Sequence, residues 1–294
     1  MKSNQFVILN LLLVFVLLIG GSFYSSTKTN QICDVEFFSA TSKGLINVTS
    51  KSAGGFSGKC IFMKIKNKSA NKLNVKLPQG TLFYPKDNGE QTLITIEDQF
   101  LTLNPMQEIE TQISGFCSEF HDHSPTKNEL FTISYNKQPK FDSLFKCMNQ
   151  LKIPSSNFQE IVWAVTDNCP VYNVSNETED LKKLRKYLFK QTKQKEVDYS
   201  TENIFRLDAN GRIINQLNNV KGNLEFTVNH GTTITQEVYT KEGLLKDKLP
   251  IGFSVLEGKT KFQFNICVKN WKKGDYVLKL KSGNEEVAKY EFAI

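Results

Sequence analysis

The stretch KCIFMKIKN at residues 59–67 decides the fold class of this chain. Ile61, Met63 and Ile65 recur at every second position and would lie on one face of an extended segment. This period of two is typical of a β-strand with one face packed against a core. Similar short runs, each bounded by Gly, Pro or Asn, follow at residues 73–78, 81–85, 92–105 and 108–117. The series predicts a sandwich of antiparallel strands.

The apolar period then changes to that of α-helices. Spacings of three and four predict a helix over residues 141–152, with a buried stripe of Leu144, Phe145, Met148 and Leu151. Ser156 followed three positions later by Gln159 has the pattern of a capping box, which predicts a second helix that ends near residues 167–168. A third helix is predicted over residues 178–196, opened by Thr178 as its N-cap. Its buried stripe is formed by Leu181, Leu184 and Leu188.

Residues 199–202 are polar, and we place a domain boundary there. Beyond them alternating apolar runs return, separated by hairpin-turn signals such as NG at residues 210–211 and SGN at residues 282–284. The chain is therefore predicted to be mainly β, with two β-sandwich domains at residues 32–198 and 203–294. Two or three α-helices are added at the C-terminal end of the first domain.

A nearly unbroken apolar run, FVILNLLLVFVLLIGG at residues 6–21, precedes both domains. It is short for a membrane span, which needs about 20 apolar residues, and it ends in the small residues typical of a secretory signal peptide. We predict that residues 1–24 are a signal peptide or an uncleaved membrane anchor, and that any membrane contact is confined to residues 6–24. The predicted location is secreted, cell-surface or outer-envelope.

Export has two chemical consequences. Six cysteines in an oxidising environment favour disulfide bonds, and none of them has C-x-x-C spacing. The spacing leaves the pairing open, with Cys117 joined to Cys147 or to Cys169 as options. In a eukaryotic host, N-x-S/T sequons would also accept glycans, at Asn47, Asn67, Asn173 and Asn176.

The charge pattern does not indicate a nucleic-acid partner. The net charge of +7 arises from 37 basic and 30 acidic residues, which are interspersed along the chain. A nucleic-acid-binding surface needs its basic residues clustered on one face. The densest basic segment is the third predicted helix, which indicates a solvated face or contact with an acidic surface. Its basic residues are Lys182, Lys183, Arg185, Lys186, Lys190, Lys193 and Lys195.

The sequence contains no G-x-S-x-G, no H-E-x-x-H and no glycine-rich phosphate loop, so we predict no enzymatic activity and no cofactor. His121 and His123 form an H-x-H near Cys117, and they would need a further ligand to hold a metal ion. Because Ser and Pro follow at residues 124–125, a polar loop is the alternative interpretation. We therefore predict no metal site, with these two histidines as the nearest candidates.

Two segments resemble a known family. Phe116 and Cys117 close the first series of strands, and FQEIVW at residues 158–163 opens the second helix. Together they resemble the bacterial thioester domains of surface adhesins, which pair an aromatic-Cys element with a downstream T-Q-x-A-I-W motif. The resemblance implies covalent host binding, with the Cys117 sulfur bonded to the side-chain carbonyl of Gln159 and with Phe116 and Trp163 excluding water. Phe and Ile stand where the motif has Thr and Ala.

The same residues also have purely structural interpretations. Gln159 completes a capping box with Ser156, and Trp163 is a core residue packed against the sandwich. Cys117 is then half of a disulfide. A thioester at Cys117 would leave an odd number of cysteines for disulfide pairing outside the cell.

The C-terminal region carries a second resemblance. GLL at residues 243–245, KGDYVLKL at residues 273–280 and KYEF at residues 289–292 are similar to the C-terminal β-sandwich of proteins exported by the type IX secretion system. In that family this domain is a sorting signal. The pattern is also shared with immunoglobulin-like domains, which is the fold that we expect for residues 203–294.

These observations predict an exported binding or adhesion protein with a protein or glycan partner. A thioester between Cys117 and Gln159 would make the capture covalent. The alternative is a non-catalytic structural protein of the cell envelope whose cysteines form disulfides.

Overall fold

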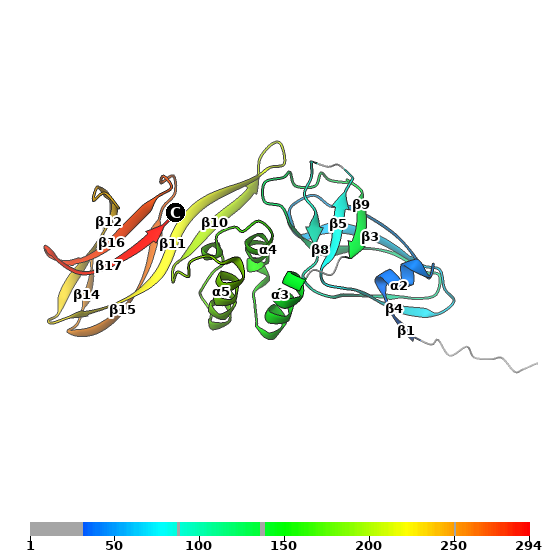
Figure 1. Ribbon diagram of the computed structural model, residues 1–294, viewed down its shortest axis with the longest axis horizontal. Coiled ribbons are helices and arrows are strands. Elements are labelled where there is room, and N and C mark those ends of the chain that lie inside the picture. The colour runs from blue at the N-terminus through cyan, green and yellow to red at the C-terminus, as the bar shows by residue number, and fades with distance from the viewer. Residues whose placement is uncertain (1–31, 87–88, 136–138, 250) are drawn as a thin grey trace, which may run out of the picture.

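The computed structural model describes residues 32–86, 89–135, 139–249 and 251–294. A first β region, a group of helices and a second β region follow one another along the long axis of the molecule (Figure 1). The chain is mainly β with added helices, as predicted. The predicted signal or anchor segment lies outside the described residues. Within the described ranges, no helix is long and apolar enough to cross a membrane.

The described part of the first β region contains two sheets. The larger has the strand order β2–β3–β8–β6–β5–β9, with β2 (Ile46–Ser52), β3 (Ser57–Asn67), β5 (Thr81–Pro85), β6 (Leu93–Ile94), β8 (Glu108–Cys117) and β9 (Phe131–Tyr135). The smaller has the order β1–β4–β7, with β1 (Ile32–Glu36), β4 (Lys72–Leu77) and β7 (Gln99–Leu103), and helix α2 (Phe37–Ser42) packs beside β4. Ile61, Met63 and Ile65 are fully buried, which confirms the alternation that predicts β3.

The helices are α3 (Pro139–Gln150), α4 (Phe158–Thr166) and α5 (Glu179–Thr192), which share one apolar cluster. Thr178 caps α5 as predicted, because its hydroxyl accepts a hydrogen bond of 3.2 Å from the backbone N–H of Leu181. α5 ends earlier than predicted, since Lys193 adopts a left-handed conformation with φ of 57°.

The capping box predicted from Ser156 and Gln159 is wrong. Ser155–Asn157 form a 3-10 turn, and α4 begins only at Phe158 without a side-chain cap. Gln159 therefore lies inside the first turn of α4, where its side chain is free to turn toward the sheet. It is 5% exposed.

The second β region also contains two sheets in its described part. One has the order β10–β11–β15, with β10 (Ser200–Leu207), β11 (Ile213–Val228) and β15 (Gly258–Cys267). The other has the order β13–β12–β16–β17, with β12 (Thr232–Thr240), β13 (Leu245–Lys248), β16 (Asp275–Ser282) and β17 (Glu285–Ala293), while β14 (Phe253–Val255) pairs with β12. Both sheets contribute to one core. The two-sandwich division and the immunoglobulin-like and sorting-signal interpretations stay predictions.

Strands β10 and β11 form a long hairpin that reaches back to the first β region (Figure 1). Residues 213–221 of β11 pair with β10, whereas residues 219–228 pair with β15. At the tip of the hairpin, the carbonyl of Gly211 accepts a hydrogen bond of 2.9 Å from the N–H of Ser124. The polar residues that predict a domain boundary include the start of β10, so this hairpin itself joins the two β regions.

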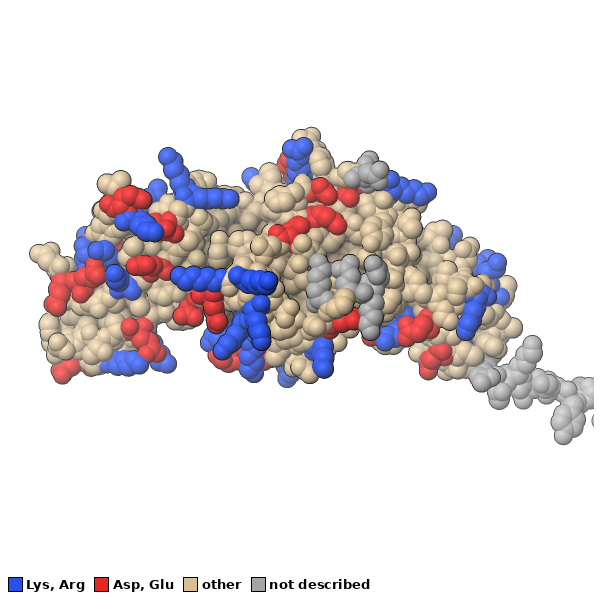
Figure 2. All heavy atoms as spheres, in the orientation of Figure 1, with Lys and Arg blue, Asp and Glu red and all other residues tan. Residues whose placement is uncertain are grey.

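Charges of both signs are interspersed over the face shown in Figure 2, and basic side chains gather most closely over α5. This distribution agrees with the mixed charge of the sequence. The absence of a nucleic-acid partner stays a prediction.

Arg185 of α5 holds the segment that leads into β10. It is 3% exposed, so the predicted solvated face does not extend to this residue. Its Nη2 donates hydrogen bonds to the carbonyls of Val197 and Tyr199, at 3.1 and 2.6 Å. Burial lowers the pKa of Arg185 to about 10, which still leaves the guanidinium charged at neutral pH. Charge-assisted hydrogen bonds of this kind are stronger than neutral ones.

We expect Arg185→Met to lower the free energy of unfolding by about 3 kcal/mol, because the carbonyls of residues 197 and 199 lose a charged donor. Urea unfolding measures this change. Lys186→Met is the matched control, since Lys186 is exposed on the same helix and should cost less than about 0.5 kcal/mol. Equal unfolding midpoints for the two variants would show that Arg185 does not stabilise the junction.

Candidate functional site

The structure brings Cys117 and Gln159 together, although they are 42 positions apart in the sequence. Cys117 is the last residue of β8, and Gln159 lies in the first turn of α4. The backbone N–H of Cys117 donates to Oε1 of Gln159 at 3.1 Å, and Nε2 of Gln159 donates to the carbonyl of Cys117 at 2.8 Å. The carboxamide thus pairs with the Cys117 backbone as a neighbouring strand would.

The thiol of Cys117 belongs to the core of the first β region. Cys117 is fully buried there, whereas Phe116 packs against Phe158 of α4 with ring centroids 5.7 Å apart. Successive side chains of a strand point to opposite faces, so the thiol and Phe116 face opposite ways. Burial, with a smaller contribution from Cys60, raises the pKa of the Cys117 thiol well above its usual range. The thiol is therefore protonated and weakly nucleophilic in this state.

The predicted disulfides are not formed in the described structure. Cys60, Cys117, Cys147, Cys169 and Cys267 each carry a free thiol. Cys147 packs with the helices, while Cys117 lies in the core of the first β region. These two residues, one of the two pairings that the sequence left open, therefore belong to different apolar clusters.

The structure gives His121 and His123 different neighbours. The ring of His123 lies between two groups of the hairpin tip, with Nδ1 2.9 Å from the carbonyl of Asn210 and Nε2 accepting a hydrogen bond of 3.1 Å from Nε of Arg212. His121 packs edge-on against Phe120. No group of three metal-ligating side chains occurs among the residues that the structure describes. The H-x-H thus belongs to a polar loop that contacts the tip of the β10–β11 hairpin.

Burial limits which sequons could carry a glycan. Asn67 is fully buried and donates from Nδ2 to the carbonyl of Asn71 at 2.8 Å, so the folded protein does not present it for glycosylation. Oδ1 of Asn173 accepts a hydrogen bond of 2.8 Å from Thr201, which fixes the orientation of this carboxamide. Asn47 is exposed on β2.

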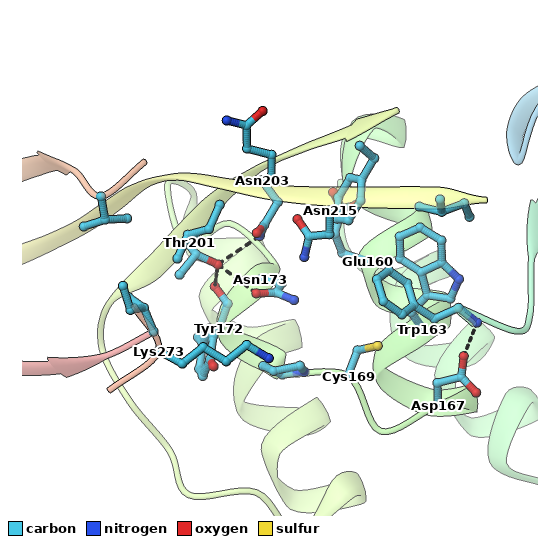
Figure 3. A pocket seen from close by; sticks show the side chains of 18 of the residues that line it. Glu160, Trp163, Asp167, Cys169, Tyr172, Asn173, Thr201, Asn203, Asn215 and Lys273 are labelled. Carbon is cyan, nitrogen blue, oxygen red and sulfur yellow. Dashed lines mark hydrogen bonds between the residues drawn. The ribbon is translucent and has the colours of Figure 1, made fainter. Parts of the chain in front are cut away.

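A pocket of about 720 Å³, here called the junction pocket, lies between the helices and the second β region (Figure 3). One wall comes from α4 and the segment after it, with Glu160, Trp163, Cys169 and Tyr172. The opposite wall comes from the β10–β11 hairpin, and the loop between β15 and β16 closes one end. These parts contribute Thr201, Asn203, Phe205, Asn215, Trp271 and Lys273, among others.

The alternation of the hairpin places its side chains in the pocket. Thr201, Asn203 and Phe205 are every second residue of β10, so they share one face of the sheet. Thr201 donates to Asn173 at 2.8 Å and accepts from Nδ2 of Asn203 at 3.0 Å, which links the two walls (Figure 3). Phe205 packs against Trp163 of α4 with ring centroids 5.0 Å apart.

Glu160 is the unusual ionisable group of the pocket. Its Oε2 is buried and has no hydrogen-bond partner among the described residues. Burial raises the pKa of Glu160 to about 7, so a large share of its carboxyl groups is neutral near neutral pH. A neutral carboxyl both donates and accepts hydrogen bonds.

Cys169 also lines the junction pocket, but its chemistry is not that of a nucleophile. Burial, and then the nearby charge of Asp167, raise the pKa of the Cys169 thiol to about 11. The carboxylate of Asp167 accepts a hydrogen bond from the backbone N–H of Phe120. The thiol is therefore protonated at neutral pH, whereas the nucleophilic form of cysteine is the thiolate.

A second hollow of about 860 Å³ lies beside β16 and β17, and Tyr172 lines both hollows. Its basic side chains are paired with acidic neighbours, Lys241 with Asp275 at 3.0 Å and Lys279 with Glu286 at 2.8 Å. Most of its charged groups thus already have partners, which makes the junction pocket the better candidate site.

The sequence indicated His121, Trp163, Cys169 and Asn173 for separate reasons, but not the pocket that they line. Its other members come from segments far apart in the chain, such as β10, β11 and the residues around Trp271. Asparagines in strands carry no distinctive motif. Only the crossing of the hairpin over α4 brings them together.

No protein-family model and no curated protein sequence matches the chain. Among solved structures, it is similar to the β-glucosidase from Kluyveromyces marxianus, both in complex with glucose and in selenomethionine-labelled form. Each match has a TM-score of 0.21 and 8% sequence identity over 80% of this chain. The chain spans 45% and 44% of the two structures, and a likeness at this TM-score carries no argument about function.

Replacing Glu160 should change how stability depends on pH. The pKa of Glu160 is about 7 in the folded protein and about 4.3 in the unfolded chain, so its stabilising contribution is present at low pH and is lost as the pH rises through 7. Glu160→Gln cannot ionise and should exceed the wild type in free energy of unfolding by on the order of 2 kcal/mol at pH 8.

Urea unfolding at pH 5 and pH 8 tests this expectation, and the difference should shrink toward pH 5. Glu257→Gln is the control, because Glu257 is exposed and the same chemical change should have little effect. A difference between Glu160→Gln and the wild type that is equal at both pH values would contradict the burial of an ionisable Glu160.

Proposed function

We propose that this chain is an exported binding protein, secreted or held at the cell surface, that binds a protein or glycan partner in the junction pocket. The apolar run at residues 6–21 supports export. One observation carries the binding role, namely a pocket of about 720 Å³ whose walls combine aromatic rings with polar side chains from α4 and from the β10–β11 hairpin. Pockets of this size, with apolar walls and a few convergent polar groups, are typical of ligand sites. The proposal includes no catalytic step.

The position of the pocket supports the same role. Interfaces between separately packed regions are preferred places for ligands, because side chains from both can reach one molecule. The alternative, a structural envelope protein, gives no reason for this arrangement.

Filling the pocket should abolish partner binding. Asn215→Trp places a large side chain at an exposed position that lines the pocket. Labelled protein is applied to arrays of glycans and of purified extracellular proteins. We expect at least one probe to bind the wild type and Asn223→Trp, a control on the same strand outside the pocket, but not Asn215→Trp.

Two results would overturn this function. If the probes that bind the wild type bind Asn215→Trp and Asn223→Trp equally well, the pocket is not the binding site. If no probe binds the wild type, the structural envelope alternative is favoured over the binding role.

Covalent capture through Cys117 and Gln159 is a second candidate function. The hydrogen bonds between the Cys117 backbone and the Gln159 carboxamide bring the two residues together, and a hollow of about 360 Å³ reaches Gln159 from the surface. The thiol would have to turn from the core toward the carboxamide before a bond could form. In this reaction the Cys117 sulfur would bond to the Gln159 side-chain carbonyl carbon, and the side-chain nitrogen would leave as ammonia with the thiol proton. A lysine amine of a partner would then displace the sulfur and form an amide bond.

The intact mass of the purified protein tests the thioester directly. If it forms, the mass is lower by one ammonia, methylamine adds to the protein, and both effects disappear in Cys117→Ala. A mass that agrees with the unmodified side chains and does not respond to methylamine would remove covalent capture and leave the non-covalent site as the working function.

A further inference from the structure

Carboxamides dominate the polar lining of the junction pocket. They belong to Asn168, Asn173, Asn203, Asn215, Gln216 and Asn270. Each carboxamide offers both a donor and an acceptor in fixed geometry. The proposed binding role of the chain does not explain why so many carboxamide side chains gather in this one pocket.

Some of these groups are available to a ligand. Asn173 and Asn203 are bonded to Thr201, and Asn168 accepts from Gln194 at 3.2 Å. The side chains of Asn215 and Asn270, by contrast, make no hydrogen bond with the described residues. Gln216 is paired with Ile204 in the hairpin, so its side chain lies on the face opposite to that of Asn215. A ligand that offers both donors and acceptors at several points would match the side chains of Asn215 and Asn270, and hydroxyl groups have this property.

The walls between the carboxamides are aromatic. Phe120, Tyr172, Phe205 and Trp271 are partly exposed residues that line the pocket. Aromatic rings present large rigid apolar surfaces at a low cost in conformational entropy. A sugar ring has an apolar face of C–H groups and an edge of hydroxyl groups, so it matches a pocket in which aromatic and carboxamide side chains alternate.

The charges of the pocket favour an uncharged ligand. The ionisable side chains that line it are His121, Glu160, Asp167, Cys169, Tyr172 and Lys273. The Asp167 carboxylate already accepts from the backbone of Phe120, and the Cys169 thiol is protonated. Lys273 is an exposed residue, and it is the only lysine or arginine that lines the pocket among the described residues. A phosphorylated or acidic ligand would need more cations than this.

The pocket is also less suited to an extended peptide. A peptide usually adds to the open edge of a sheet and takes its affinity from backbone hydrogen bonds. Here β10 and β11 turn a face of side chains toward the pocket, and their backbones pair with each other. The available hydrogen-bonding groups are therefore those of side chains.

We propose that the junction pocket binds a neutral oligosaccharide, held by the carboxamides of Asn203, Asn215 and Asn270 and packed against the aromatic walls. This inference rests on the proposed role of the pocket as the binding site. It adds the chemical class of the ligand, which is polyhydroxylated and uncharged.

Saturation-transfer NMR and isothermal titration calorimetry with the purified protein test the inference. The probes are neutral di- to tetrasaccharides of glucose, galactose, mannose and N-acetylglucosamine, with oligogalacturonates as acidic counterparts. We expect at least one neutral series to bind, and Asn215→Ala to weaken its binding by about tenfold through the loss of one hydrogen-bonding side chain. Asn223→Ala on the same strand should bind as the wild type does. Unfolding curves establish that both variants are folded.

The outcomes separate the inference from the function on which it rests. Binding of only acidic probes, or neutral binding that Asn215→Ala leaves unchanged, would overturn the assignment of a neutral sugar. If no saccharide binds but a protein probe still depends on an open pocket in the Asn215→Trp comparison, the ligand class is wrong and the binding function stands. If neither saccharide nor protein binds, both fail.

Discussion

The pairing of the Gln159 carboxamide with the backbone of Cys117 fixes helix α4, and the middle of the molecule depends on that helix. α4 spans only Phe158–Thr166, and an isolated helix of this length is unstable in water. It persists because most of its residues are buried. Phe158 packs on Phe116 of the first β region, and Trp163 packs on Phe205 of the β10–β11 hairpin. A single short helix thus contacts both β regions.

The junction pocket is a consequence of this arrangement. The hairpin must cross α4 to reach the loop at His123, where Arg212 and Asn210 contact the imidazole. Two surfaces that belong to different cores meet along the crossing, and side-chain packing does not close the space between them. The polar lining on both sides keeps that space open to water or to a ligand. Arg185 adds a second connection between α5 and the entry to β10.

Local signals in the sequence predicted much of the fold. The period of two at residues 59–67 identified β3, and Thr178 identified the start of α5, because each depends only on neighbouring residues. Gln159 shows where such signals fail. Its spacing from Ser156 matches a capping box, but the carboxamide makes two hydrogen bonds with the backbone of β8 and none with the start of the helix. Arg185 likewise stands among exposed lysines, and only the tertiary path of the chain makes it buried.

The candidate site was harder to predict for the same reason. Cys117 and Gln159 were identified as a pair from sequence, and they do lie in contact, but the contact by itself has a complete structural explanation. The hydrogen-bonded carboxamide and a thioester are alternative states of one side chain, because forming the thioester expels the nitrogen that donates to the Cys117 carbonyl. That buried carbonyl would lose its carboxamide donor, at a cost of about 1–3 kcal/mol unless another group replaced it. Non-covalent binding in the junction pocket requires no such exchange, and it leaves the pairing that positions α4 intact.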